Sequence, residues 1–214
     1  YIAIASFIGG SILRFDRDPY SWRSKSSQLL RRKQLIWGSI LFHLGILVIL
    51  AGHVVGLLTP IFIFDAVGIT HGAKQILAMT AGGIAGIFCL IGLLMLLHRR
   101  LFDPRIRATS SFADIAILVL LLVQLLLGLY TITESMKHLD GHEMVKFMEW
   151  AQHIATFRGG AHEYVSDVAL VFKLHLTFGM FILLIFPFTR LVHAFSAPIG
   201  FVFRPYQIVR KRER

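Results

Sequence analysis

Long apolar runs dominate the chain, and short polar segments separate them. Four runs of nearly uncharged residues lie at roughly 35–58, 76–97, 113–133 and 168–188. About twenty apolar residues are enough to cross the hydrocarbon core of a bilayer. A shorter apolar stretch, YIAIASFIGGSIL, opens the chain and ends beside Arg14 and Arg17. The pattern predicts five membrane-spanning helices, of which the first is represented only by its later residues.

Composition agrees with this interpretation. Hydrophobic residues make up 56% of the chain, charged residues make up 16%, and the mean hydropathy is +0.69. A soluble domain usually carries about 25% charged residues. Only helices and closed barrels can span lipid. We therefore expect an all-α integral membrane protein, with residues 1–214 forming one helical bundle. No secretory signal is expected at the start, because no basic region precedes the first apolar stretch and no small-residue cleavage site follows it.

The basic residues are unevenly distributed, and their distribution predicts the orientation of the helices. Three segments are rich in Lys and Arg, with seven such residues in 14–36, four in 99–107 and five in 204–214. In contrast, Lys74 is the one Lys or Arg residue in 61–74, and 134–167 holds three basic residues and six acidic ones. Short basic loops stay in the cytoplasm. This predicts an outer N-terminus, a cytoplasmic C-terminus with 204–214 as a cytoplasmic tail, and an outer 142–157 segment lying along the membrane surface. The net charge of +10 then suits anionic lipid or a cytoplasmic partner, and not nucleic acid.

Four of the ten histidines lie inside the predicted spans or directly after the last one, at His43, His53, His175 and His193. An ionisable group at membrane depth is a functional hypothesis by default. The structural alternative is a core histidine bonded to a neighbouring carbonyl. Cys89 is the one cysteine, so the chain has neither an internal disulfide nor a C-x-x-C-H sequence for covalent haem attachment.

The spacing of these histidines suggests two metal-binding pairs. His175 and His193 are 18 residues apart, about five helical turns, which would place them on one side of a continuous helix. Two histidines on each of two helices can clamp two non-covalent haem irons between imidazoles. Antiparallel helices would pair His53 with His175 and His43 with His193. The helical rise gives about 15 Å within the first helix and about 27 Å within the second, so tilt and a kink near Pro187 must absorb the difference.

Nearby glycines and charges have two interpretations each. A haem packed against a helix needs a surface without side chains, but small residues also let membrane helices approach each other. The glycines concerned are Gly45, Gly52, Gly56 and Gly179. Lys173 and Arg190 lie close to histidines and could pair with haem propionates, or could reach an interface instead. The negatively charged Asp114 side chain would be stabilising at the N-terminus of a helix, because of the helix dipole.

Five segments, in order along the chain, resemble the gamma subunit of respiratory nitrate reductase, a di-haem cytochrome b of the cell inner membrane: LFHLGILVILAGHVVGLLTP, HRRLFDPRIRATS, WAQHIATFRGGA, FKLHLTFGMFILLIFPFTRLVHAFSAP and RPYQIVRKR. The resemblance implies five helices and two haems b. It also implies that His43 and His193 bind the inner haem iron and that His53 and His175 bind the outer one. Lys74 matches the family's quinol-site lysine, with Gly52 and His53 beside the haem edge. Without the resemblance, Lys74 could simply extend toward the lipid headgroups.

The resemblance also implies a function in anaerobic respiration. Quinol, either menaquinol or ubiquinol, would be oxidised near the outer, periplasmic face. Electrons would pass through both haems to an iron–sulfur beta subunit and a molybdenum-containing alpha subunit that reduces nitrate. The segments LFDPRIRATS and RPYQIVRKRER are the expected docking surfaces. Alternatives are a related di-haem subunit of a sulfur-metabolising complex, a haem-free membrane anchor, and an ion or metal transporter that uses the histidines.

Overall fold

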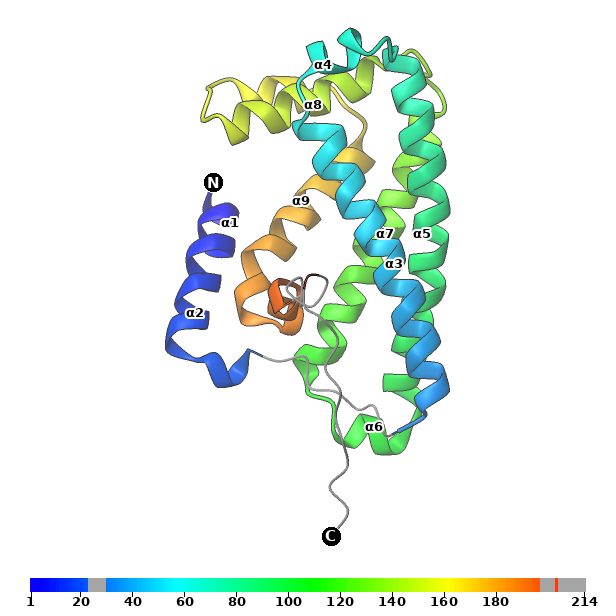
Figure 1. Cartoon of the computed structure of the whole chain (residues 1–214), viewed down its shortest axis with the longest axis vertical. Coiled ribbons are helices and arrows are strands. Elements are labelled where there is room, and N and C mark those ends of the chain that lie inside the picture. Colours follow the sequence, from blue (N-terminus) through cyan, green and yellow to red (C-terminus); the bar gives the residue numbers. More distant parts are fainter. Residues whose placement is uncertain (23–29, 197–202, 204–214) are drawn as a thin grey trace.

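The computed structural model describes residues 1–22, 30–196 and 203, and every regular element in these ranges is a helix (Figure 1). Four helices are long and apolar enough to cross a membrane: α3 (Arg32–Leu58), α5 (His71–Phe102), α7 (Phe112–Ser135), and α9 (Leu170–Ile185) extended to Phe188. They coincide with the four long runs predicted from the sequence. The all-helical membrane fold is therefore confirmed, whereas the orientation of the termini stays a prediction.

The predicted first span is a shorter helical run in the described residues. It comprises α1 (Ile2–Ala5), a π-helical turn η1 (Ser6–Gly10) and α2 (Ser11–Arg17). This run is not among the helices long enough to cross a membrane, so the structure does not establish a fifth span. In Figure 1 it stands beside α9 at one edge of the molecule, and α5 stands at the opposite edge.

Capping side chains fix where two of the long helices begin. The Thr70 hydroxyl accepts a hydrogen bond from the Ala73 amide at 3.2 Å, and α5 starts at His71. At α7, Ser111 and Asp114 form a reciprocal capping box. Such contacts satisfy amide groups that have no partner within a helix. Asp114 therefore lies at a helix start, as predicted.

Helix α3 packs closely along α5, while α7 packs against both α5 and α9. At the α3–α5 contact, a Cβ added at Gly45 would lie 2.6 Å from the Ala85 carbonyl oxygen and 2.7 Å from Cys89 Cβ. Cys89 is buried at this contact. Among the described helices, α3 and α9 are not a closely packed pair. Helix α3 is thus connected to α9 through α5 and α7.

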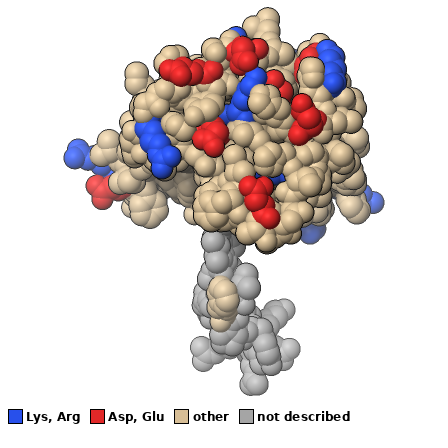
Figure 2. Space-filling model, turned by 90° about the horizontal axis from the view of Figure 1, so that it is seen from above, with Lys and Arg blue, Asp and Glu red and all other residues tan. Residues whose placement is uncertain are grey.

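Shorter helices connect the long ones. They are η2 (Pro19–Ser21), α4 (Ile61–Ala66), α6 (Pro104–Ala108), α8 (His142–Ala155), η3 (Ala161–Val165), η4 (Phe186–Phe188) and η5 (Arg190–Ser196). Helix α8 lies across one end of the bundle (Figure 1) and covers most of the 142–157 segment, whose outer position along the membrane surface stays a prediction. Its Gln152 amide donates to the Leu57 and Thr59 carbonyls at 3.1 and 3.2 Å, at the end of α3. Figure 2 views this end of the molecule and shows Asp and Glu side chains scattered across it.

The chain leaves the α-helical conformation before it reaches His193. Helix α9 ends at Ile185, Pro187 lies in the 3-10 turn η4, and His193 lies in the separate 3-10 helix η5. The prediction that His175 and His193 share one face of a continuous helix was therefore wrong. Proline removes an amide donor and its ring obstructs the preceding turn, which ends the α-helix here.

Candidate functional site

The structure brings the four membrane histidines together as two pairs. The ring centroids of His43 and His193 are 6.1 Å apart, and those of His53 and His175 are 6.2 Å apart. His43 and His53 are both on α3, whereas His175 is on α9 and His193 is on η5. These are the pairs that the antiparallel arrangement predicted. The break at Pro187 resolves the mismatch in helical rise, because His175 and His193 need not be separated along one straight helix.

Both separations fit two imidazoles on opposite sides of one metal ion. A metal–imidazole nitrogen bond is about 2 Å long, so with the nitrogen about 1 Å from its ring centre the two centroids lie about 6 Å apart. Among the described residues, no group of three or more His, Cys, Asp or Glu side chains could hold a metal. Two imidazoles supply only axial ligands, a set that suits haem iron and not a tetrahedral zinc ion.

Hydrogen bonds set the tautomer of three of these imidazoles. In each case the Nδ1–H group donates to a backbone carbonyl, at distances of 2.7, 2.7 and 2.5 Å; the pairs are His43 with Ser39, His53 with Ile49, and His193 with Arg190. The proton on Nδ1 leaves Nε2 with a free lone pair. Such a bond also fixes the ring orientation.

His175 has different surroundings, provided by α7. Its Nδ1 is buried without a hydrogen-bond partner, and so is Oε1 of Gln124. The Gln124 amide nitrogen donates to the His175 carbonyl at 3.1 Å and lies 3.5 Å from the ring Nε2. A Cβ added at Gly128 would lie 3.0 Å from His175 Cε1. Gln124 and Gly128 were not among the residues predicted from the sequence, although an amide inside the run LLLVQLLLGL is itself a signal of function.

The glycines near the histidines divide into two groups. Gly45 adjoins α5, and a Cβ at Gly179 would lie 3.2 Å from the Gln124 amide nitrogen, so both allow close helix packing. A Cβ at Gly52 or Gly56 would meet no atom within 4 Å. Only the second group leaves the α3 surface open beside His53, as packing against a flat macrocycle requires.

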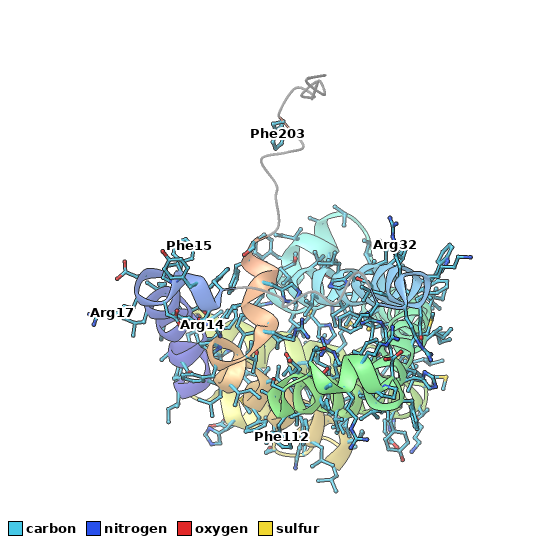
Figure 3. The ribbon with its side chains drawn as sticks, turned by 90° about the horizontal axis from the view of Figure 1, so that it is seen from below. Arg14, Phe15, Arg17, Arg32, Phe112 and Phe203 are labelled. Atoms are coloured by element: carbon cyan, nitrogen blue, oxygen red, sulfur yellow. The ribbon has the colours of Figure 1, made fainter. Side chains whose placement is uncertain are left out.

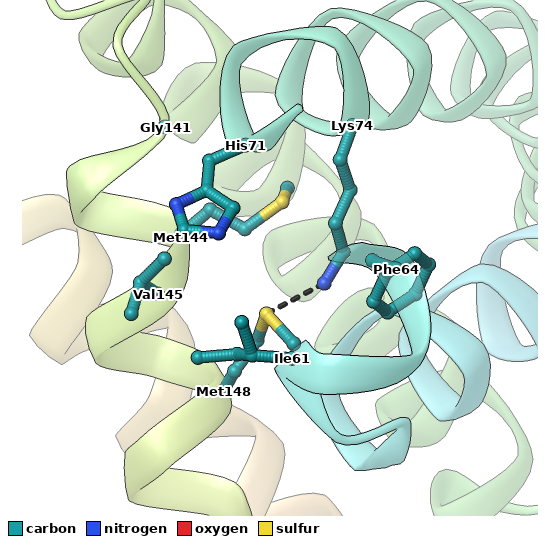
Figure 4. A pocket seen from close by; sticks show the side chains of 8 residues that line it. All are labelled: Ile61, Phe64, His71, Lys74, Gly141, Met144, Val145 and Met148. Carbon is teal, nitrogen blue, oxygen red and sulfur yellow. Dashed lines mark hydrogen bonds between the residues drawn. The ribbon is translucent and has the colours of Figure 1, made fainter. Parts of the chain in front are cut away.

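Lys74 lies in a small pocket at the α8 end of the bundle (Figure 4). Its side chain is buried, and its ammonium donates to the Gly56 carbonyl at 3.0 Å and to Met148 Sδ. The same nitrogen is 3.9 Å from the centroid of the Phe64 ring. The pocket is lined by Ile61, Phe64, His71, Lys74, Gly141, Met144, Val145 and Met148. The ammonium therefore points inward, toward the helix turn that follows His53, and not toward lipid headgroups.

Comparison with known proteins agrees with the resemblance in the sequence. The sequence profile of the nitrate reductase gamma subunit family matches residues 1–212. The chain belongs to this family. It is 51% identical to the respiratory nitrate reductase 1 gamma chain of Escherichia coli (strain K12), with 99% of this chain and 94% of the relative covered. It is 41% identical to the nitrate reductase gamma chain of Bacillus subtilis (strain 168), with 99% and 95% covered.

A more distant relative is the Hdr-like menaquinol oxidoreductase cytochrome b-like subunit of Archaeoglobus fulgidus. It is 28% identical over 156 residues, which cover 72% of this chain and 46% of the relative. Family membership makes the chain a multi-pass membrane cytochrome b component of a nitrate reductase complex with alpha and beta subunits. The four apolar helices agree with that placement.

Two charged residues of this gamma subunit have partners that the sequence did not indicate. The Lys173 ammonium is exposed and donates to the Ser166 carbonyl at 2.6 Å. Arg190 Nη1 lies 3.4 Å from Asp114 Oδ1, and Arg100 Nη1 lies 3.9 Å from the other oxygen of this carboxylate. Part of the Arg190 guanidinium is thus engaged by the Asp114 carboxylate. The predicted docking tail 204–214 lies outside the described residues, whereas LFDPRIRATS includes the described helix α6.

Proposed function

We propose that this gamma subunit is the di-haem, quinol-oxidising subunit of its nitrate reductase. The observation that supports this most directly is the pair of imidazole–imidazole separations, 6.1 and 6.2 Å, at two levels along α3. Haem b held by two imidazoles supplies one-electron redox chemistry, and its potential depends on axial ligands, hydrogen bonding and burial. His43 and His193 would hold the inner haem iron, and His53 and His175 would hold the outer one.

The residues of the chain hold these ligands in a suitable tautomer. Carbonyls of the preceding helical turn accept the Nδ1 protons of His43 and His53, so that Nε2 is the available ligand atom. The open surface at Gly52 gives a flat ring system access to α3. Because His43 and His53 are ten residues apart, the pairs are separated by about 15 Å along α3.

Quinol would be oxidised beside the outer pair. Lys74 donates to the Gly56 carbonyl, three residues beyond His53, so an oxygen that accepts a hydrogen bond from this ammonium would lie close to the outer histidine pair. The aromatic and thioether side chains of Phe64 and Met148 surround the ammonium. Such a pocket can exclude water while one cationic donor holds a quinol hydroxyl oxygen. Gly52 and His53 would line the path from this pocket to the haem edge.

Electrons would leave at the opposite end of the bundle, toward the iron–sulfur beta subunit and then the molybdenum-containing alpha subunit. The inner pair lies on that side. Arg190, three residues before His193, contacts Asp114, which Arg100 also approaches. With the predicted orientation, quinol protons would be released outside while electrons move inward. Nitrate would be reduced in the alpha subunit and not in this chain.

A reduced-minus-oxidised visible spectrum of the purified chain tests this proposal. We expect two b-type signals, with loss of one in His43→Ala and of the other in His53→Ala. A colourless wild-type protein would instead indicate a haem-free anchor or transporter. If two haems are present, the subunits that co-purify distinguish a nitrate reductase from the oxidoreductase type of the Archaeoglobus relative. The chain is 51% identical to the Escherichia coli gamma chain and 28% identical to the Archaeoglobus subunit, so we expect nitrate reductase subunits.

A further inference from the structure

The break at Pro187 interrupts the backbone hydrogen-bond pattern of α9. Helix α9 ends at Ile185, and the next residues form two 3-10 segments separated by Thr189. An α-helix pairs each carbonyl with an amide four residues later, and proline has no amide to offer. Within a membrane such groups must be satisfied by other parts of the protein. The donors at this break come from the other end of the chain.

Two side chains of the N-terminal helical run supply these donors. The Ser6 hydroxyl donates to the Leu184 carbonyl at 2.7 Å. Arg14 Nη1 donates to the carbonyls of Pro187 and Thr189, at 2.5 and 2.8 Å. The rest of the Arg14 guanidinium donates to the hydroxyl and carbonyl oxygens of Ser21, at 3.1 and 2.8 Å, so the whole group is held in one orientation.

Apolar contacts bring the same two segments together. The Phe7 ring meets the Phe186 ring edge-on at 4.8 Å and lies 5.5 Å from Phe195, which follows His193 by two residues. A Cβ added at Gly10 would lie 2.8 Å from Pro187 Cγ, so the N-terminal run approaches the proline ring closely. Beyond His193, the Ser196 hydroxyl accepts a hydrogen bond from the Trp22 indole at 2.6 Å.

We infer that the N-terminal helical run, acting chiefly through Arg14, positions His193 for the inner haem iron. This inference rests on the proposed function. His193 cannot be held by the regularity of α9, because that helix ends eight residues earlier. Its segment is instead fixed at 184, 187, 189 and 196 by Ser6, Arg14 and Trp22. His175 lies within α9, before the break, and needs no such support.

The difference between the two histidines makes the inference testable by selectivity. In Arg14→Ala, the Pro187 and Thr189 carbonyls lose their donor, so His193 should shift while His175 stays in place. We expect haem content to fall from two toward one per chain, with loss or a clear spectral shift of the signal that is absent in His193→Ala. The other signal should be unchanged. Arg14→Lys should restore part of the inner signal, because one ammonium can reach these carbonyls without the full guanidinium fork.

Arg17→Ala is the matched control. Arg17 is an exposed arginine one turn further along the same helix, and Figure 3 shows it pointing away from the bundle. We expect two unchanged haem signals in this variant. Electron paramagnetic resonance of the two ferric haems on purified, full-length chains gives a readout that does not depend on quinol oxidation or on nitrate reduction.

An unchanged inner signal in Arg14→Ala, or equal loss of both signals, would overturn the inference. If Arg14→Ala does not accumulate in membranes, Ser6→Ala removes only one of the three carbonyl contacts and should still perturb the inner signal selectively. The proposed function itself fails at an earlier step, if wild-type chain lacks two haems or His193→Ala retains both. If those reference proteins behave as proposed and the Arg14 and Ser6 variants do not, only the positioning inference is wrong.

Discussion

Gly45 offers a quantitative test of how α3 is held in place. A Cβ there would lie 2.6 Å from the Ala85 carbonyl oxygen and 2.7 Å from both the amide nitrogen and Cβ of Cys89. Ordinary contact begins at 3.4 Å, so α3 and α5 must separate locally by about 0.8 Å in Gly45→Ala. Two of these atoms belong to the backbone of α5 and cannot rotate away. Overpacking of this kind costs about 1–3 kcal/mol.

The assay is thermal unfolding of the haem-loaded chain in detergent, followed by circular dichroism and haem absorbance. For a chain of this size, about 1 kcal/mol corresponds to roughly 2–4 °C in Tm, so we expect Gly45→Ala to lower Tm by about 2–12 °C. Because α3 carries one histidine of each pair, and because such sites tolerate only about 0.5 Å of displacement, both haem signals should change.

The matched control is Gly82→Ala on α5, where an added Cβ meets no atom within 4 Å. Its Tm should stay within about 2 °C of wild type, as for a substitution that creates no clash. If Gly45→Ala and Gly82→Ala unfold at the same temperature, or if only one haem signal responds to Gly45→Ala, the reasoning from α3–α5 packing is refuted.

Three further predictions concern the two ends of the bundle. Lys74→Ala should greatly slow the reduction of haem by quinol while both haems remain bound, whereas Lys137→Ala, at an exposed lysine paired with Glu134, should leave the rate unchanged; equal rates in both variants would exclude a role for Lys74. The Lys146 ammonium lies 2.8 Å from Asp167; this hydrogen bond lowers the pKa of Asp167 below its usual 3.8 and raises the pKa of Lys146. Stabilisation of α8 through Asp167 is therefore present above pH 3.8 and is lost as the pH falls through the lowered pKa; hydrogen exchange of α8 amides should accelerate there in wild type, with no such step in Lys146→Gln. Deletion of 204–214 should release the soluble subunits from membranes and leave the haem spectrum intact, and full retention of those subunits would contradict the docking assignment.

The apolar pattern predicted the four long helices well, because hydrocarbon thickness imposes their length. It placed the start of α5 near residue 76, whereas the Thr70 cap begins that helix at His71. Pro187 indicated a kink, but the sequence alone did not show that the chain continues as 3-10 helices and that His193 belongs to one of them.

Tertiary contacts account for what the sequence did not predict about the site. Arg190 was considered as a propionate partner from its distance to His193, but its contact with Asp114 depends on where α7 begins. Gln124 and Gly128 contact His175 from another helix, and no local sequence pattern predicts that contact. The two histidine pairs could be predicted because antiparallel helices allow only one order of pairing.

The length of α5 places the Lys74 pocket at a particular depth. Its 32 residues span about 48 Å, against a hydrocarbon core of about 30 Å. A helix centred in the bilayer therefore extends about 9 Å, or six residues, beyond the acyl chains at each end. Lys74 is the fourth residue of α5, so its pocket lies at the depth of the glycerol and phosphate groups, while its ammonium stays inside the protein. An amphiphile could present its polar ring there and keep its isoprenoid chain dissolved among the lipid tails, entering sideways without ever passing through bulk water.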